Sequence, residues 1–144
     1  MSNISASVAT VLQPAGLEKS IGLLSTVYQK DPSDPQWKND PGTLEYHRFM
    51  KKYYPEGDPN DSLNVNGYNT AQTLVQVLKR CGDDLTRENV MRQATNLKNL
   101  DLPMLLPGIK INTSATDRYP LKQLQMMRFD GARWIGFGEV IGHE

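Results

Sequence analysis

The chain has 144 residues, and its 16 lysines and arginines balance 16 aspartates and glutamates. That length fits one ordinary domain and leaves little room for two. The zero net charge argues against a nucleic-acid-binding protein, which usually carries a basic excess. A mean hydropathy of −0.53 without a long apolar run argues against a membrane span, and the first residues show no signal peptide. One cysteine excludes an internal disulfide and a cysteine-based zinc site.

The N-terminal segments predict strand and loop. Small, β-branched, uncharged residues fill 4–12 and fit a buried strand, a strand-to-helix turn or both. Pro14-Ala15-Gly16 then predicts a break. The apolar run 21–28 has the length of a strand and suits one covered on both faces, as in a parallel sheet. Three prolines and three aspartates make 31–42 a surface loop.

Three helices are expected in the middle of the chain. Asp40 is placed to cap a helix over 41–54 whose first residue is Pro41. The clearest helix covers 68–81, where apolar residues recur at helical spacing before Gly82. A shorter helix follows over 87–97.

The C-terminal part predicts strands. Residues 109–112 alternate like a short strand, and 123–137 read as a hairpin with a two-residue Asp130-Gly131 turn. Only one strand clearly precedes the helices. The strands are therefore too few for a complete doubly wound sheet.

Few residues suggest catalysis or metal binding. His47 and His143 are the only histidines, and no nucleophile or zinc-protease motif accompanies them, which argues against an enzyme. A hydrolase built on His47 stays as an alternative. The loop aspartates match no calcium motif, so turn formation and helix capping are favoured for them. Cys81, near a helix end, is expected to be a buried, unreactive thiol.

Two short stretches could bind a small polar ligand. Asn64, Asn66 and Tyr68 combine amides and a phenol at an expected helix start. An asparagine-capped helix with Tyr68 packed beneath it is the competing interpretation. Ser5, Ala6 and Ser7 could offer hydroxyl and N–H groups to a carboxylate, or form a plain turn.

Several motifs, in this order, change the interpretation. They are Leu12-Gln13-Pro14-Ala15-Gly16-Leu17-Glu18 with Gly22-Leu23-Leu24-Ser25, then Tyr28-x-Lys30-Asp31-Pro32, Gly67-Tyr68 with Ala71-Gln72-Thr73-Leu74-Val75-Gln76-Val77-Leu78, Cys81-Gly82-Asp83-Asp84-Leu85, Leu106-Pro107-Gly108-Ile109 and Arg128-Phe129-Asp130-Gly131. With them the chain resembles the C-terminal portion of the solute-binding proteins of branched-chain amino-acid-type ABC transporters. The resemblance runs from about residue 5 to residue 141.

The resemblance implies an α/β fold, namely part of the type I periplasmic binding protein fold. That fold has two three-layer, Rossmann-like lobes joined by crossing strands, and a C-terminal β-hairpin is expected here. Residues 1–20 would belong to the second lobe and 21–108 to the first. Residues 109–144 would return through the hinge to the second lobe. Members are more than twice this length, so the resemblance implies a truncated portion.

The resemblance also implies a function without catalysis, cofactor or metal. A periplasmic receptor would close around a small solute, a branched-chain amino acid or an aromatic carboxylate, and deliver it to an ABC permease. The site would include Ser5, Ala6 and Ser7 from the second lobe and the stretch before Tyr68 from the first. Asn64 and Asn66 depart from the aromatic residue that is common there. A sensory or regulatory module of the same fold is the alternative, and the isolated portion is expected to bind weakly and to self-associate.

Overall fold

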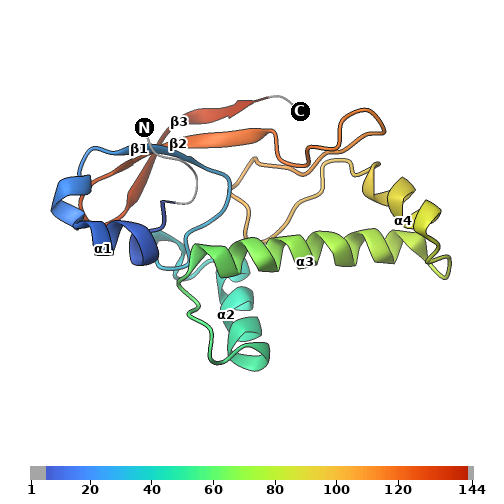
Figure 1. Ribbon diagram of the computed structural model, residues 1–144, viewed down its shortest axis with the longest axis horizontal. Coiled ribbons are helices and arrows are strands. Elements are labelled where there is room, and N and C mark those ends of the chain that lie inside the picture. Colours follow the sequence, from blue (N-terminus) through green and yellow to red (C-terminus); the bar gives the residue numbers. More distant parts are fainter. Residues whose placement is uncertain (1–5, 143–144) are drawn as a thin grey trace.

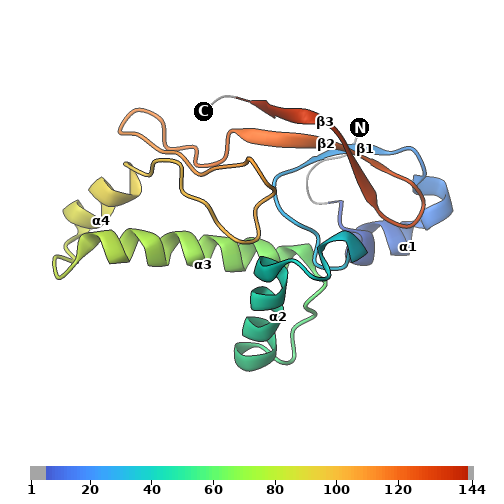
Figure 2. The ribbon, with the colours of Figure 1, turned by 180° about the vertical axis from the view of Figure 1, so that it is seen from behind.

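The computed structural model of the chain describes residues 6–142. A three-stranded sheet lies along one side of the molecule and the long helix α3 (Ser62–Cys81) along the other (Figures 1 and 2). The helix α2 (Pro41–Tyr53) projects from the first half of α3, and α4 (Arg87–Ala94) follows its end. A π-helical turn (Val8–Leu12) is the first element of the described residues, and it runs into α1 (Gln13–Ala15).

Residues 8–15 are helical, so this part of the predicted stretch forms a turn and not a strand, and residues 4 and 5 lie outside the described residues. Ser7 caps it by accepting a hydrogen bond from the amide of Thr10. The run ends at Gly16, whose φ of 98° lies in the region that favours glycine. The predicted break at Pro14-Ala15-Gly16 is confirmed.

The sheet has the order β1-β2-β3, and both pairings are antiparallel. Its strands are β1 (Leu24–Val27), β2 (Gln123–Phe129) and β3 (Trp134–Gly142). The prediction of a doubly covered parallel strand over 21–28 is wrong. The strand is shorter because Gly22 turns the chain just before it, and Ile21 and Leu24 stay exposed.

The C-terminal hairpin is confirmed, but its turn is longer than predicted. The last strand pair joins Phe129 to Trp134, which leaves a four-residue loop. The Asp130 carboxylate accepts hydrogen bonds from the amides of Ala132 and Arg133, each at 2.8 Å. A side chain therefore organises this loop, where a two-residue turn would use backbone geometry alone.

The helices begin at capping residues. Asp40 accepts a hydrogen bond from the amide of Thr43 at 2.9 Å, with Pro41 in the first turn, as predicted. The helix predicted over 68–81 in fact begins at Ser62, because Asp61 caps it by accepting from the amide of Leu63. The prediction missed this cap because Asp61 lies in a loop-like sequence. Cys81, at the end of α3, is buried as expected.

The strand predicted over 109–112 does not form. Ile109 and Ile111 do share a buried face, as alternation requires. Only one isolated bridge, between Leu100 and Ile111, pairs this stretch. The alternation predicted correctly which side chains are buried. Among the described residues, however, no neighbouring strand pairs with this stretch to form a continuous set of backbone hydrogen bonds.

The core consists of separate clusters. The sheet-end cluster packs the first helical turns against one end of the sheet and contains Ala6, Leu12, Met127, Phe129 and Trp134. The helix cluster lies between α3 and the following loops and contains Val77, Cys81, Leu97, Leu102, Leu105, Leu106, Ile109 and Ile111. The α2–α3 cluster contains Tyr46, Met50, Val65, Tyr68 and Met104. Val27, in β1, packs against both the sheet-end cluster and the helix cluster.

Tyr46 offers a test of the α2–α3 cluster. It is 0% exposed, and its hydroxyl has no hydrogen-bond partner among the described residues. Burial, with added repulsion from Asp61 and Asp58, raises its pKa to about 12. We expect Tyr46→Phe to leave the free energy of unfolding unchanged or to raise it by up to about 1 kcal/mol in urea denaturation. Tyr46→Ala, which leaves a cavity, should lower it by about 3–5 kcal/mol.

A destabilisation of more than about 1 kcal/mol by Tyr46→Phe would contradict this, because it would mean that the hydroxyl is hydrogen-bonded in the folded chain.

Candidate functional site

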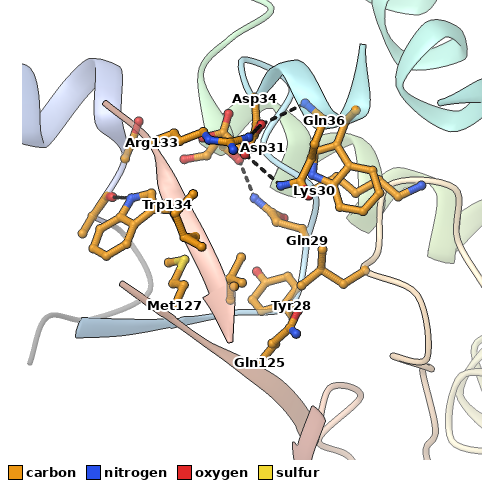
Figure 3. Close-up of a pocket in the computed structure, with 18 of the residues that line it drawn as sticks. Tyr28, Gln29, Lys30, Asp31, Asp34, Gln36, Gln125, Met127, Arg133 and Trp134 are labelled. Atoms are coloured by element: carbon orange, nitrogen blue, oxygen red, sulfur yellow. Dashed lines mark hydrogen bonds and ion pairs between the residues drawn. The ribbon is translucent and has the colours of Figure 1, made fainter. Parts of the chain in front are cut away.

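A pocket of about 490 Å³ opens between the sheet, the start of α3 and the residues that follow β1 (Figure 3). Its lining combines residues of the sheet-end cluster, such as Ala6, Met127 and Trp134, with Leu106 of the helix cluster. The pocket therefore lies where the two clusters meet. Its volume is within the range of cavities that hold small molecules.

Polar groups enter the pocket from the segment that leaves β1. The Tyr28 hydroxyl accepts a hydrogen bond from Asn66 Nδ2 at 2.9 Å, so its own hydrogen stays available to donate. Burial raises the pKa of Tyr28, which keeps the phenol neutral. Gln29 Nε2 donates to the carbonyl of Ser62 at 2.9 Å. Gln29 Oε1 is buried and has no hydrogen-bond partner among the described residues.

The opposite wall is apolar and rigid. Trp134 packs edge-on against Phe129, with ring centroids 5.4 Å apart. Its indole Nε1 donates to the carbonyl of Ala6 at 2.9 Å, which fixes the ring and the first described residue together. Met127 and Val140 extend this wall along β2 and β3. Such a surface suits an apolar side chain or a ring.

A buried ammonium fixes the loop that borders the pocket. Lys30 Nζ lies 2.8 Å from both carboxylate oxygens of Asp40 and 2.8 Å from the carbonyl oxygen of Pro103. It also lies 5.2 Å from the ring centroid of Trp37. Gly42 is required beside it, because a Cβ there would clash with the Pro103 carbonyl. The loop 31–40 is thus tied at its base to α2 and to the 97–111 segment.

A second ion pair borders the pocket. Arg133 Nη1 donates to Asp34 Oδ1 at 3.0 Å, and both residues line the pocket (Figure 3). The lining cations are therefore Lys30, paired with Asp40, and Arg133, paired with Asp34. Among residues 6–142, the pocket offers no unpaired cation to an anionic ligand.

The match to a protein family decides what this arrangement belongs to. Residues 3–133 match the family described as periplasmic binding protein. This chain belongs to the periplasmic binding protein family. No curated protein matches it. The family and the fold that the sequence predicted are confirmed.

Solved structures agree on the fold at low sequence identity. A branched-chain amino acid ABC transporter protein from Thermus thermophilus with bound valine matches with a TM-score of 0.71 and 19% identity, over 92% of this chain and 36% of that one. A possible leucine/isoleucine/valine-binding protein from Rhodopirellula baltica matches with a TM-score of 0.70 and 15% identity, over 94% and 34%. A leucine-binding protein from Thermotoga maritima gives 0.63 and 19%, over 97% and 36%. This periplasmic binding protein chain thus spans about a third of their length.

The structure places the predicted site residues in different surroundings. Ala6, Ser7 and Asn66 line the pocket, whereas Ser5 lies outside the described residues. Asn64 and Tyr68 are not part of the lining. Because α3 begins before them, successive residues turn by about 100° and point in different directions.

Asn64 and Tyr68 have structural contacts instead. Asn64 Nδ2 donates to the carbonyl of Asp58 at 2.8 Å and holds the loop before α3. Tyr68 is buried against Tyr46, with ring centroids 5.4 Å apart. Tyr68 is therefore the packed tyrosine of the competing interpretation, although the cap of its helix is Asp61 and not an asparagine.

Sequence reasoning missed most of the polar lining. Tyr28 and Lys30 belong to a motif that supported the family resemblance, so that motif was the available signal. Asp34 and Arg133 lie 99 residues apart, and no local pattern links them.

The loop aspartates form turns and caps, as favoured from the sequence. Asp31 accepts from the amide and hydroxyl of Ser33, and Asp34 caps the 3₁₀ turn Pro35–Trp37. In the described part of the chain, no group of three acidic, histidine or cysteine side chains could hold a metal ion. No helix within residues 6–142 is long and apolar enough to cross a membrane.

The Lys30–Asp40 pair predicts a pH dependence. Burial alone would raise the pKa of Asp40, but hydrogen bonds from Lys30 and the Thr43 amide outweigh it, and the pKa is lowered. A carboxyl with a lowered folded pKa stabilises the fold above its unfolded pKa, and this is lost as the pH falls through the folded pKa. We expect Asp40→Asn to cost about 2–4 kcal/mol at pH 7 and to flatten the loss of stability below about pH 4.

The measurement is urea denaturation between pH 2 and 7 in roughly one-unit steps, which cover the titration of carboxyl groups. Asp101→Asn is the matched control, because Asp101 pairs with Lys110 at the surface and should contribute little. Equal effects of the two substitutions would contradict the role given to Lys30.

Proposed function

We propose that this chain is part of an extracytoplasmic solute-binding protein of an ABC transport system. Its pocket would form part of a cleft that closes around a small solute. The observation that carries this is the place of the pocket between two core clusters that the strands of the sheet connect. Strands that run between two packed bodies can act as a hinge, and a ligand bound between them biases closure.

The arrangement of the clusters supports a two-lobed organisation. The buried residues of the sheet-end cluster come from 6–12 and 127–134, which belong to the proposed second lobe, and Leu23 and Val27 of the 21–108 segment pack against them. The helix and α2–α3 clusters lie almost wholly within the proposed first-lobe segment 21–108. We infer that 1–20 and 109–144 supply second-lobe and hinge segments. The remaining two thirds of such a protein would then complete both lobes, and the whole would work in the periplasm with a permease.

The solute that fits best has an apolar body. Met127, Val140 and the ring of Trp134 can pack a branched side chain or an aromatic ring. A branched-chain amino acid or an aromatic acid meets the apolar requirement. Because both lining cations are paired, the carboxylate of the solute would bind backbone amides or groups outside residues 6–142. Among the described residues, the pocket lining contains no histidine, and His47 in particular is not part of it, so the lining favours binding without catalysis.

Solute binding can be tested by NMR on the chain itself. We expect leucine, valine, isoleucine or benzoate to shift the side-chain amide signals of Gln29 and Asn66 and the indole signal of Trp134. The shifts should saturate only near millimolar concentration, because one side of the cleft is incomplete. Asn66→Ala should weaken this binding, whereas Asn64→Ala, a matched change on the same helix, should not.

Two results would contradict the proposal. If none of these solutes shifts the three signals, the pocket is not a solute site of this class. Micromolar binding by the chain alone would instead refute the claim that further segments are needed.

The exposed face of α3 predicts self-association of the chain. Leu74, Val75 and Leu78 lie on this helix with 52%, 42% and 39% of their surfaces exposed. Contiguous apolar surface of this kind favours association. We expect light scattering to show a dimer or larger species that Leu74→Lys shifts toward monomer, while Lys79→Glu does not. A monomer at millimolar concentration would contradict the expectation.

A further inference from the structure

The two sides of the pocket are joined by one ion pair in addition to the strands. Asp34 lies in the loop 31–40, which Lys30 anchors to α2 and the 97–111 segment. Arg133 lies at the tip of the β2–β3 hairpin, beside Trp134 of the sheet-end cluster. Of the ion pairs among residues 6–142, the others each join residues within 30–122. The Asp34–Arg133 pair alone reaches from the loop to the hairpin tip.

The carboxylate of Asp34 depends on this contact. Its side chain is only 4% exposed, whereas that of Arg133 is 45% exposed. Gln36 donates to both carboxylate oxygens, from its amide at 2.9 Å and from its side chain at 2.8 Å. These two donors are neutral, so Arg133 supplies the only ionic partner that the described residues show for Asp34. Removing it would leave a buried charge without compensation, which is costly.

Both ends of the pair are held in place. The Asp130 carboxylate accepts from the amide of Arg133 at 2.8 Å, and Trp134 is bonded to the carbonyl of Ala6. On the other side, Gln36 and the Lys30–Asp40 pair hold the Asp34 loop. The hairpin tip and the loop 31–40 are therefore each held to their own side of the pocket. A rotation about the strands that opened the pocket would separate Arg133 from Asp34.

We propose that the Asp34–Arg133 ion pair is a latch that holds this pocket closed and sets how often it opens. It would regulate the site of the proposed function, and it rests on that function for what the pocket binds. The exposure of Arg133 makes the latch reversible, because water and salt compete for its guanidinium. The latch biases the pocket toward closure and still allows it to open.

The latch can be tested by measuring opening directly. Spin labels at Lys19→Cys and Lys51→Cys, in a Cys81→Ala background, report the distance between the sheet-end side and α2; both lysines are exposed. Pulsed electron–electron resonance is recorded on the full chain without solute. We expect Arg133→Gln and Asp34→Asn to lengthen and broaden the distance distribution and to raise the open-to-closed ratio about tenfold, since a hydrogen bond between charged groups is lost.

Two controls separate a latch from a general effect of charge. Arg133→Lys keeps one charged donor and should keep the short distance. Arg128→Gln removes the same charge from an exposed position on the same hairpin and should change nothing. Raising the salt concentration toward 1 M should lengthen the distance in the chain that carries no latch substitution, because anions then compete for the exposed guanidinium of Arg133.

An unchanged distance in both Arg133→Gln and Asp34→Asn would overturn the latch, as would an equal change in Arg128→Gln. The salt series requires no latch substitution, so it decides the question if a variant does not fold. Because the distances are measured without solute, the two proposals fail separately. Latch-dependent distances without any solute binding refute only the proposed solute, whereas solute binding with unchanged distances refutes only the latch.

Discussion

The loop 31–40 and α2, on one side of the pocket, depend on the contacts of the Lys30 ammonium group. It joins three segments that are distant in sequence: the end of β1, the start of α2 and the loop at Pro103. A buried ammonium is tolerated only when its donors are satisfied, and here a carboxylate and a carbonyl satisfy them. The same carboxylate caps α2 through the amide of Thr43. The Lys30–Asp40 ion pair therefore holds both the start of α2 and the loop 31–40 beside the pocket.

The sheet provides the second constraint. Pairing of Leu24 with Arg128 and of Val27 with Gln125 brings together residues about a hundred positions apart. One end of these strands belongs to the sheet-end cluster, and the other approaches the helix cluster through Val27 and Val140. The backbone hydrogen bonds of the sheet thus connect the two clusters, and the pocket lies between them. In the proposed closing motion, the ends of these strands are the places where a change of backbone angles would be absorbed.

Within residues 6–142, two residues of α3 lack the partners that Lys30 and the strands of the sheet have. Asn69, on α3, is buried with neither polar atom partnered among the described residues, and it faces a second hollow of about 310 Å³. Leu74 lines the same hollow and remains half exposed. Orphaned amides and exposed apolar side chains both cost free energy. Both residues lie on α3, and the chain spans about a third of the length of its structural relatives.

The sequence by itself determined the family, the α/β class, the cap at Asp40 and the C-terminal hairpin, because these follow from short-range patterns and motif order. It also predicted a binding site that included Ala6, Ser7 and Asn66, and these three residues line the pocket of the structure. Only the tertiary structure decided that β1 pairs antiparallel, that Tyr68 packs in a core and that Arg133 meets Asp34. These depend on contacts between distant segments and on where α3 begins, since each residue shifts a helical side chain by about 100°. Local composition does not encode that rotation, so the lining of the pocket could be read only from the fold.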